Sequence, residues 1–244
     1  INLAKSFVEL GHDVLILNNS KNNNDSSKIN SLNISNLKEK LFFDLAIANN
    51  DCNLFSKIHS KKKILLSHSI QNFEKFIRKK QLLSYLKYKP KVALLGNYHI
   101  KNRSYFTRMF GHFFLTYGVD DLFINSKLYN VDNIDKNQAI FTSRPDRNLD
   151  LLINLWSSKI YPKNNKAKLL ITPKENFSNY NNIFKRQFAD RSIMLDDLRK
   201  SRLFLVPGHK AELFCLAAEE ARELCVPIVT LGIGSLSERV DQKK

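Results

Sequence analysis

The stretch Val206-Pro-Gly-His-Lys-Ala-Glu-Leu-Phe-Cys-Leu-Ala-Ala-Glu-Glu-Ala221 decides the fold of this 244-residue chain. An apolar run ends at Val206, a Pro-Gly turn follows, and a segment rich in Ala, Leu and Glu predicts a helix over 213–224. Free backbone amides and the positive end of the helix dipole then lie beside the carboxyl end of a strand. That arrangement is typical of a phosphate or diphosphate site in an open α/β sheet.

The same rhythm of apolar run, turn and amphipathic stretch repeats along the whole chain, which indicates β-α units and mostly parallel sheets. A helix is expected over 146–157, with Leu149, Leu152, Ile153 and Trp156 on one side. The continuous Leu, Ile and Val content of the strands predicts burial on both faces. We expect strands at 13–17, 44–48, 63–67, 91–95, 113–117, 139–142, 168–172, 202–206 and 227–231.

The length allows two modest domains. A polar segment rich in Asn and Asp follows Gly-Val-Asp120, so a boundary is expected between Gly118 and Asn137. The predicted domains are 1–125 and 126–244. Because residues 1–10 already have the pattern of a helix and the chain starts with Ile, the first domain is expected to lack its start. The second domain is expected to lack its end, so both are expected to be incomplete. The polar run 18–28 is expected to be a loop.

The chain is strongly basic, with 39 Lys and Arg against 23 Asp and Glu and a net charge of +16. Such a charge favours anionic partners, which include nucleic acid, acidic lipid and phosphorylated substrates. No basic motif interleaved with aromatic residues is present, so nucleic acid is not the expected partner. The three cysteines show no paired spacing and no His cluster, which argues against disulfides and a metal site and favours a reducing cytosol. No apolar run approaches the length of a membrane span.

Two pairs of charged residues are candidates for binding a ligand. Glu212 and Glu220 are eight residues apart, so on a common helical path they would lie about 12 Å apart along the axis and about 80° apart around it. One extended polar ligand could contact both. Arg144 and Arg147 are three residues apart before a helix, so their guanidinium groups could converge on one anion.

The stretch 207–221 with Val226-Pro-Ile-Val229 resembles the signature of the retaining glycosyltransferases of family 4, which is Glu-x7-Glu within a conserved Pro, Phe and Leu pattern. The resemblance implies two facing Rossmann-like domains of the GT-B type. It also implies that Glu212 lies beside the sugar of a nucleotide-diphosphate donor and that Glu220 binds the ribose. The amides of Phe214, Cys215 and Leu216 would face the diphosphate, and Gly208 and His209 in the turn are further donor-binding candidates.

A second resemblance covers Ile140-Phe-Thr-Ser-Arg144-Pro-Asp-Arg147-Asn-Leu-Asp150, which is similar to the start of the family's donor domain. It implies that Arg144 and Arg147 grip the donor phosphates. His68 ends a strand where the family often has a His near the reaction centre, and is kept as a catalytic candidate. The chain departs from the family pattern at Asn148, Cys215 and Cys225, where Gly is usual. A side chain at Cys215 narrows the approach to the phosphates.

These features predict a glycosyltransferase that moves a sugar from a nucleotide-diphosphate sugar to a glycan or lipid-linked acceptor with retention. The expected context is cell-surface polysaccharide or lipopolysaccharide synthesis, with no cofactor and no metal. The expected location is cytoplasmic, with peripheral contact to the inner, anionic face of a membrane. A sugar-nucleotide epimerase or a phosphorylase of the same architecture, and a basic nucleic-acid-binding protein, remain alternatives.

Overall fold

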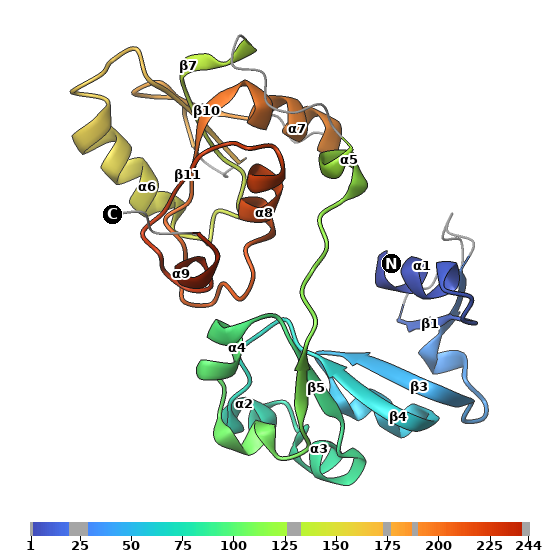
Figure 1. Ribbon diagram of the computed structural model, residues 1–244. Coiled ribbons are helices and arrows are strands. Elements are labelled where there is room, and N and C mark those ends of the chain that lie inside the picture. The colour runs from blue at the N-terminus through green and yellow to red at the C-terminus, as the bar shows by residue number, and fades with distance from the viewer. Residues whose placement is uncertain (1, 20–28, 126–132, 173–176, 187–189, 241–244) are drawn as a thin grey trace. The chain divides into compact units, whose positions relative to one another are not determined.

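The computed structural model describes residues 2–19, 29–125, 133–172, 177–186 and 190–240 (Figure 1). It is an α/β protein with three sheets in which all the strand pairs whose register is defined are parallel. This confirms the predicted fold class. The chain divides into two compact units, one made of Ile1–Leu66 and Phe73–Val92 and the other of Ser67–Asn72 and Ala93–Lys244.

The first unit contains most of the elements before residue 92. Strand β1 pairs with β2, and β3 pairs with β4. The fully buried side chains Phe55, Leu65 and Tyr85 form its core. The elements of this unit are α1 (Asn2–Glu9), β1 (Leu15–Asn18), β2 (Asn30–Asn33), η1 (Ile34–Asn36), β3 (Phe42–Asn49), η2 (Cys52–Lys57), β4 (His59–Leu66), α2 (Phe73–Arg78), α3 (Leu82–Tyr88) and the start of β5 (Lys91–Leu94).

The second unit is built on a five-stranded sheet in the order β11-β10-β7-β8-β9. Numbered within this sheet alone, that order is 5-4-1-2-3, the arrangement of a doubly wound Rossmann-like sheet. The elements are α4 (Asn97–Lys101), η3 (Tyr105–Arg108), β6 (His112–Phe114), α5 (Asp121–Ile124), β7 (Asp135–Phe141), α6 (Leu149–Leu155), the π-helical turn η5 (Trp156–Ile160), β8 (Lys168–Ile171), β9 (Ile183–Lys185), α7 (Arg191–Lys200), β10 (Ser201–Leu205), α8 (Leu216–Glu223), β11 (Ile228–Val229) and α9 (Leu236–Arg239).

Both faces of this sheet are covered, because alternate residues of the central strand β7 enter two different cores. Ala139 and Phe141 pack with the α6 residues Leu149 and Leu152. Ile140 packs in a cluster that includes residues of α7 and α8. Figure 1 shows α6 on one side of the sheet and α7 and α8 on the other. The predicted burial on both faces is therefore confirmed for β7.

Most predicted strands are present, with two differences. Strands β2 and β9 were not predicted. Strand β2 is short and mostly polar, and β9 has only three residues. In the first unit, β3 buries Ala46 and Ala48 but leaves Leu45 and Ile47 each 36% exposed, so the prediction of burial on both faces is wrong for this strand. Most of the predicted loop 18–28 lies outside the described residues.

The predicted domain boundary between Gly118 and Asn137 includes residues outside the described ranges. The two compact units divide the chain at other positions than the predicted boundary. The domains 1–125 and 126–244 therefore stay a prediction.

Candidate functional site

The candidate site lies at the carboxyl ends of two neighbouring strands of the second unit. Strands β7 and β10 are adjacent, and the chain runs from them to helices that cover opposite faces of the sheet. In a doubly wound sheet this is the topological switch point, where the two following loops separate and leave room for a ligand. The loop after β7 carries Arg144 and Arg147, and the loop after β10 carries 207–215. The sequence-predicted residues of both loops therefore share one edge.

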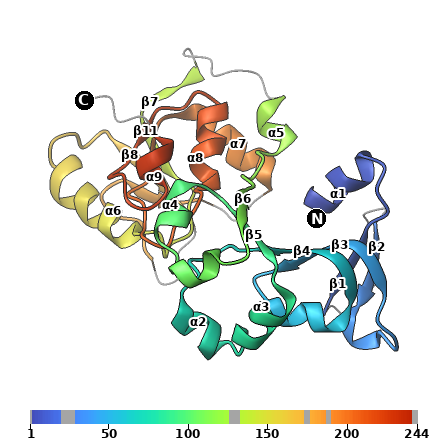
Figure 2. The same ribbon diagram turned by 60° about the horizontal axis from the view of Figure 1, so that its bottom comes forward.

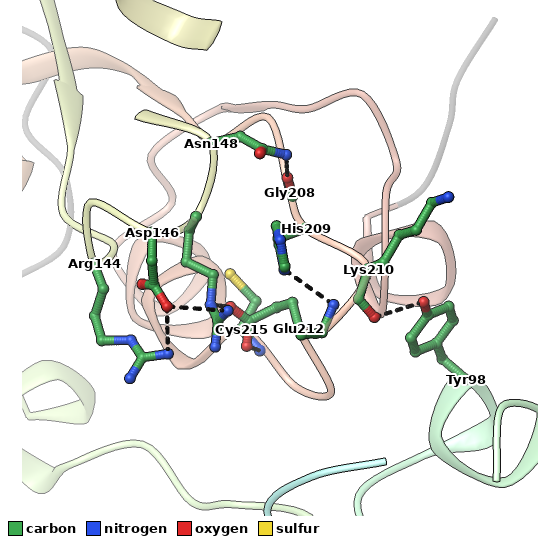
Figure 3. Close-up of polar contacts among 11 residues, drawn as sticks. Tyr98, Arg144, Asp146, Asn148, Gly208, His209, Lys210, Glu212 and Cys215 are labelled. Atoms are coloured by element: carbon green, nitrogen blue, oxygen red, sulfur yellow. Dashed lines mark hydrogen bonds and ion pairs between the residues drawn. The ribbon is translucent and has the colours of Figure 1, made fainter. Parts of the chain in front are cut away.

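The loop after β10 is tightly held. Gly208 has φ of 89° and forms a bridge with Ile233. Its carbonyl oxygen accepts a hydrogen bond of 2.5 Å from Asn148 Nδ2 of the loop after β7 (Figure 3). His209 Nδ1 accepts from the amide of Ala211 at 3.0 Å, and the His209 carbonyl accepts from the amide of Glu212 at 2.8 Å. Gly208 and His209 thus shape the loop, and Asn148 joins the two halves of the site.

An ion-pair network links the two loops. Arg147 Nε forms an ion pair with Glu212 Oε2 at 2.9 Å, and Arg147 Nη1 lies 3.5 Å from Asp146 Oδ2. Arg144 Nη2 contacts the same Asp146 oxygen at 3.0 Å (Figure 3). The arginines therefore do converge on one anion, but here it is the carboxylate of Asp146. That residue was not predicted, although its place between two arginines in the sequence was a visible signal.

Exposure distinguishes the two arginines. The side chain of Arg144 is 69% exposed, whereas those of Arg147 and Glu212 are only 15% and 19% exposed. An ion pair at low exposure is screened less than one in bulk water. Arg147 is therefore the arginine held in place, and Arg144 is free to turn toward an anion that enters from solvent.

Cys215 stands immediately before α8 in the left-handed conformation, with φ of 57° and ψ of 70°. Its amide donates to Glu212 Oε1 at 3.1 Å, so in this structure the amide is paired with a carboxylate of the chain. Burial, assisted by the negative charge of Glu212, raises the pKa of the Cys215 thiol to about 12. The thiol is therefore protonated at neutral pH and is no nucleophile.

Helix α8 begins at Leu216 and not at the predicted residue 213. The left-handed turn at Cys215 reverses the chain before the helix starts, so Glu212 lies outside the helix. The helical relation between Glu212 and Glu220, about 12 Å and 80°, does not hold for that reason. Leu216 is the first helical residue and its amide has no acceptor within the helix. Phe214 is buried in the cluster of Leu95 and Leu213.

Glu220 lies on α8 and is buried, with 4% of its surface exposed. Its Oε1 accepts a hydrogen bond of 2.8 Å from Arg191 Nη2, and Arg191 Nη1 contacts Asp120 Oδ2 at 2.7 Å. Burial raises the pKa of the Glu220 carboxyl, and the positive charge of Arg191 opposes that rise. Arg191 was not predicted to belong to the site. Its sequence context, the first residue of an ordinary amphipathic helix, contained no signal for this role.

His68 is in the same compact unit as the loop after β10. Its ring stacks on Tyr117, with ring centres 5.5 Å apart, and Tyr117 meets the ring of Phe214 edge-on at 5.1 Å. The guanidinium of Arg239 lies over the Phe214 ring, 3.8 Å from its centre. Burial lowers the pKa of the His68 imidazole, which favours the neutral form. Aromatic contacts therefore connect His68 with the loop, and its catalytic role stays a prediction.

The loop is also fastened from α4. Tyr98 donates its hydroxyl hydrogen to the carbonyl of Lys210 at 2.8 Å (Figure 3), and its amide donates to Glu238 Oε2 at 2.7 Å. Arg239 Nη2 donates to the carbonyl of Leu95 at 2.9 Å. Helix α9 and the start of α4 thus hold the loop from one side, and none of these contacts was predicted.

Two findings concern the described residues alone. They contain no cluster of three or more His, Cys, Asp or Glu side chains placed to bind a metal ion. None of their helices combines the length and the apolar character that crossing a bilayer requires. The expectations of no metal and of a cytoplasmic location remain predictions.

No protein-family model matches the chain, and no curated protein is similar to it in sequence. Solved structures do match. Sucrose-phosphate synthase from Thermosynechococcus elongatus superposes with a TM-score of 0.59 at 12% identity, over 82% of this chain and 58% of that one. S. aureus TarM, in complex with fondaparinux, alpha-GlcNAc-glycerol and UDP, gives 0.58 at 19% identity, over 82% and 44%.

A trehalose-6-phosphate synthase gives a TM-score of 0.54 at 12% identity, over 81% of this chain and 59% of that one. The chain thus spans about half the length of the structures that it matches. At these identities the likeness concerns the fold. The chain has the α/β architecture of the GT-B glycosyltransferases, as predicted.

Proposed function

We propose that this chain belongs to a retaining glycosyltransferase of family 4, which transfers a sugar from a nucleotide-diphosphate sugar to a glycan or lipid-linked acceptor. One observation carries the proposal. The loops after β7 and β10 meet at the switch point of a doubly wound sheet, and there Arg147 contacts Glu212 at the entrance to α8. A cation and a helix start at this edge suit a diphosphate, and the carboxylates suit the hydroxyls of a sugar and a ribose.

In the proposed reaction the bond between the anomeric carbon and the diphosphate oxygen breaks, and the electron pair leaves with the diphosphate. The acceptor oxygen forms the new bond to the anomeric carbon, and its proton passes to the leaving diphosphate. Arg144, Arg147 and the first amides of α8 stabilise the negative charge of the leaving diphosphate. Glu212 orients the donor sugar, and Glu220 accepts hydrogen bonds from the ribose. His68 in its neutral form is the candidate to contact the reacting sugar.

Binding of a diphosphate involves an exchange of partners. Arg147 is already neutralised by Glu212 and Asp146. An incoming diphosphate with two negative charges competes for this guanidinium and for the exposed Arg144. The Glu212 carboxylate is then released toward the donor sugar. The site is therefore held in shape by the same two side chains that the substrate would separate.

The wider context follows from charge. The net charge of +16 supports peripheral contact with an anionic membrane at its cytoplasmic face. A lipid-linked acceptor in polysaccharide or lipopolysaccharide synthesis fits that location. We propose that the reaction requires no metal or cofactor, since the arginines supply the charge for the leaving group.

The test is a panel of nucleotide sugars and free nucleoside diphosphates, screened by thermal shift with the wild-type chain, Arg147→Ala and Glu220→Ala. A ligand that binds the folded state at a hundred times its Kd stabilises it by about 2.7 kcal/mol. We expect both variants to lose this shift. Arg202→Ala is the matched control, because Arg202 is an exposed arginine of β10 away from the loop. Unchanged affinity in both site variants would refute the site.

Products decide among the enzyme classes. Incubation of the best donor with candidate acceptors should yield a transferred sugar whose anomeric configuration equals that of the donor. An isomerised donor would indicate an epimerase, and a sugar phosphate would indicate a phosphorylase. Salt-dependent binding of DNA or RNA without any response to nucleotide sugars would favour a nucleic-acid-binding protein.

A further inference from the structure

Helices α2 and α3 belong to the first unit (Figures 1 and 2) and carry exposed apolar and basic side chains. Leu83 is 80% exposed, Ile77 52%, Phe73 47% and Leu86 37%. We call this the α2–α3 surface. Its basic members are Lys75, Arg78, Lys79, Lys80, Lys87 and Lys89.

The base of this surface is rigidly packed. Phe76 and Tyr85 are buried, with their rings 5.0 Å apart in an edge-on arrangement. Between the helices, the buried Gln81 accepts from the amide of Cys52 at 3.4 Å and donates to the carbonyl of Asn50 at 3.2 Å. The inner faces of both helices are therefore anchored in the unit. The outward apolar side chains are a fixed feature of the surface and not the result of a loose segment.

The charge of the surface is one-sided. Residues 73–89 contain six Lys and Arg and a single acidic residue, Glu74. Burial lowers the pKa of Lys75, and the positive charges of Lys79 and Arg78 lower it further. The cations are thus close enough to repel one another. An anionic surface would relieve that repulsion.

Two of the lysines stand in costly backbone conformations. Lys80 follows α2 with φ of 53°, and Lys89 caps the end of α3 with φ of 48°. In this left-handed region a residue with a Cβ is less stable than Gly by about 1–2 kcal/mol. Basic residues do favour the negative end of a helix dipole, which explains part of the cluster. The dipole does not explain the exposed leucines and isoleucine beside them.

We propose that the α2–α3 surface binds an anionic lipid bilayer, with Ile77, Leu83 and Leu86 inserted among the acyl chains and the lysines at the level of the headgroups. A surface that carries both apolar and cationic side chains matches the two layers of a membrane interface, which are the acyl chains and the anionic headgroups. A nucleic acid would pair with the basic side chains but would leave the apolar side chains exposed to water. The inference does not depend on sugar transfer, because vesicles without nucleotide sugars test it.

The experiment is co-sedimentation of the chain with vesicles of phosphatidylcholine, with and without 30% phosphatidylglycerol. We expect binding to the anionic vesicles alone. Lys79→Gln combined with Lys80→Gln should weaken it about twenty-five-fold, at about fivefold for each lysine. Ile77→Ser combined with Leu83→Ser should weaken it on the order of tenfold. Lys79→Arg with Lys80→Arg keeps the charges and should bind as the wild type does.

Matched controls localise the effect. Lys163→Gln with Lys166→Gln removes two exposed charges from the other unit, and Leu10→Ser removes an apolar side chain that is 74% exposed just after α1. Neither should alter binding, and circular dichroism should show that every variant is folded. Equal binding to both kinds of vesicle, or full binding by the Ile77 and Leu83 variant, would overturn the proposal. Loss of binding in the controls as strong as in the surface variants would also overturn it.

Discussion

Arg147 Nε lies 2.9 Å from Glu212 Oε2, in an ion pair that joins the loop after β7 to the loop after β10. The same carboxylate accepts the amide of Cys215 through its other oxygen at 3.1 Å. Glu212 is therefore the acceptor on which both the arginine and the start of α8 depend. Without a ligand it keeps the two loops together across the edge of the sheet.

The first prediction separates the charge of Glu212 from its hydrogen bonds. Glu212→Gln keeps an oxygen for the Cys215 amide but removes the charge that pairs with Arg147. If Glu212 orients the donor sugar, the kcat/KM of the Glu212→Gln variant for sugar transfer should fall on the order of a hundredfold. Glu212→Ala leaves both the amide and the guanidinium without this acceptor, so it should also lose about 1–3 kcal/mol of stability.

Initial rates with the best donor and urea unfolding measure these two effects. Glu223→Gln is the matched control, because Glu223 ends α8 and is exposed. Wild-type turnover in Glu212→Gln would contradict the proposed role of this carboxylate. An Ala variant as stable as the Gln variant would contradict its role in holding the loops.

The second prediction concerns a strained helix end. Cys225 follows α8 with φ of 58°, its amide donates to the carbonyl of Arg222, and the amide of Val226 donates to that of Ala221, both at 2.9 Å. This is a Schellman motif, in which Gly is the favoured residue at the left-handed position. Cys225→Gly should raise stability by about 1 kcal/mol and Tm by about 2–4 °C.

Differential scanning calorimetry checks this, with Cys225→Ala as the control. Alanine removes the exposed thiol but keeps the Cβ, so it should bring no gain. An equal gain in both variants would attribute the effect to the thiol and not to the backbone.

The third prediction concerns pH. Because burial raises the folded-state pKa of Glu220 above its unfolded value, the folded state favours the protonated carboxyl. The contribution of this group to stability is full below the unfolded pKa, near 4.5, and declines as the pH rises through the raised folded pKa. Arg191 and Asp120 act on the same carboxyl in opposite directions, and their net effect does not remove the rise.

Glu220→Gln removes this titration. We expect the Tm difference between the Gln variant and the wild type to increase in favour of the variant between pH 4.5 and pH 7. The affinity for the nucleoside diphosphate should fall at the same time, because an amide pairs less strongly with ribose hydroxyls than a carboxylate does. A Tm difference that does not change with pH would show that Glu220 ionises normally.

Sequence periodicity was enough to predict the parallel strands and the switch-point edge, because buried apolar runs and Gly or Pro turns are local signals. Residue spacing and the family resemblance made Arg144, Arg147, Glu212 and Glu220 site candidates, and their roles stay predictions. Neither identified Asp146 or Arg191 as their partners. Asp146 was a missed local signal, because it stands between the two arginines. The contacts of Arg147 with Glu212 and of Arg191 with Glu220 join segments far apart in the sequence, and β10 lies beside β7 although two strands intervene. No local pattern contains that information.

Backbone conformation explains another part of the difference. Asn148, Cys215 and Cys225 stand where the family that the sequence resembles usually has Gly, and all three are left-handed, with φ of 62°, 57° and 58°. The turns that Gly usually forms are therefore kept without Gly. The expected helix start at residue 213 was wrong, because helix propensity does not predict a left-handed turn. The turn at Cys215 makes α8 begin only at Leu216.

The last prediction concerns the glycine that supports the loop after β10. Gly234 has φ of 75°, and a Cβ at this position would meet the carbonyl oxygen of His209 and lie 3.0 Å from that of Glu212. The amide of Ser235 donates to the same Glu212 carbonyl at 3.0 Å, so neither segment can move away without breaking this bond. Gly234→Ala should therefore cost about 1–2 kcal/mol for the backbone conformation, and the collision adds to this.

Displacement of His209 and Glu212 should also weaken binding of the nucleoside diphosphate, because the Arg147 contact is then misplaced. Gly118→Ala is the matched control, since nothing lies within 4 Å of a Cβ built there. Urea unfolding and thermal shift with the diphosphate should separate the two variants. If Gly234→Ala were as stable as Gly118→Ala and bound the ligand equally well, the loop would not depend on the close approach of these backbones, and the site would tolerate a geometry other than the one described.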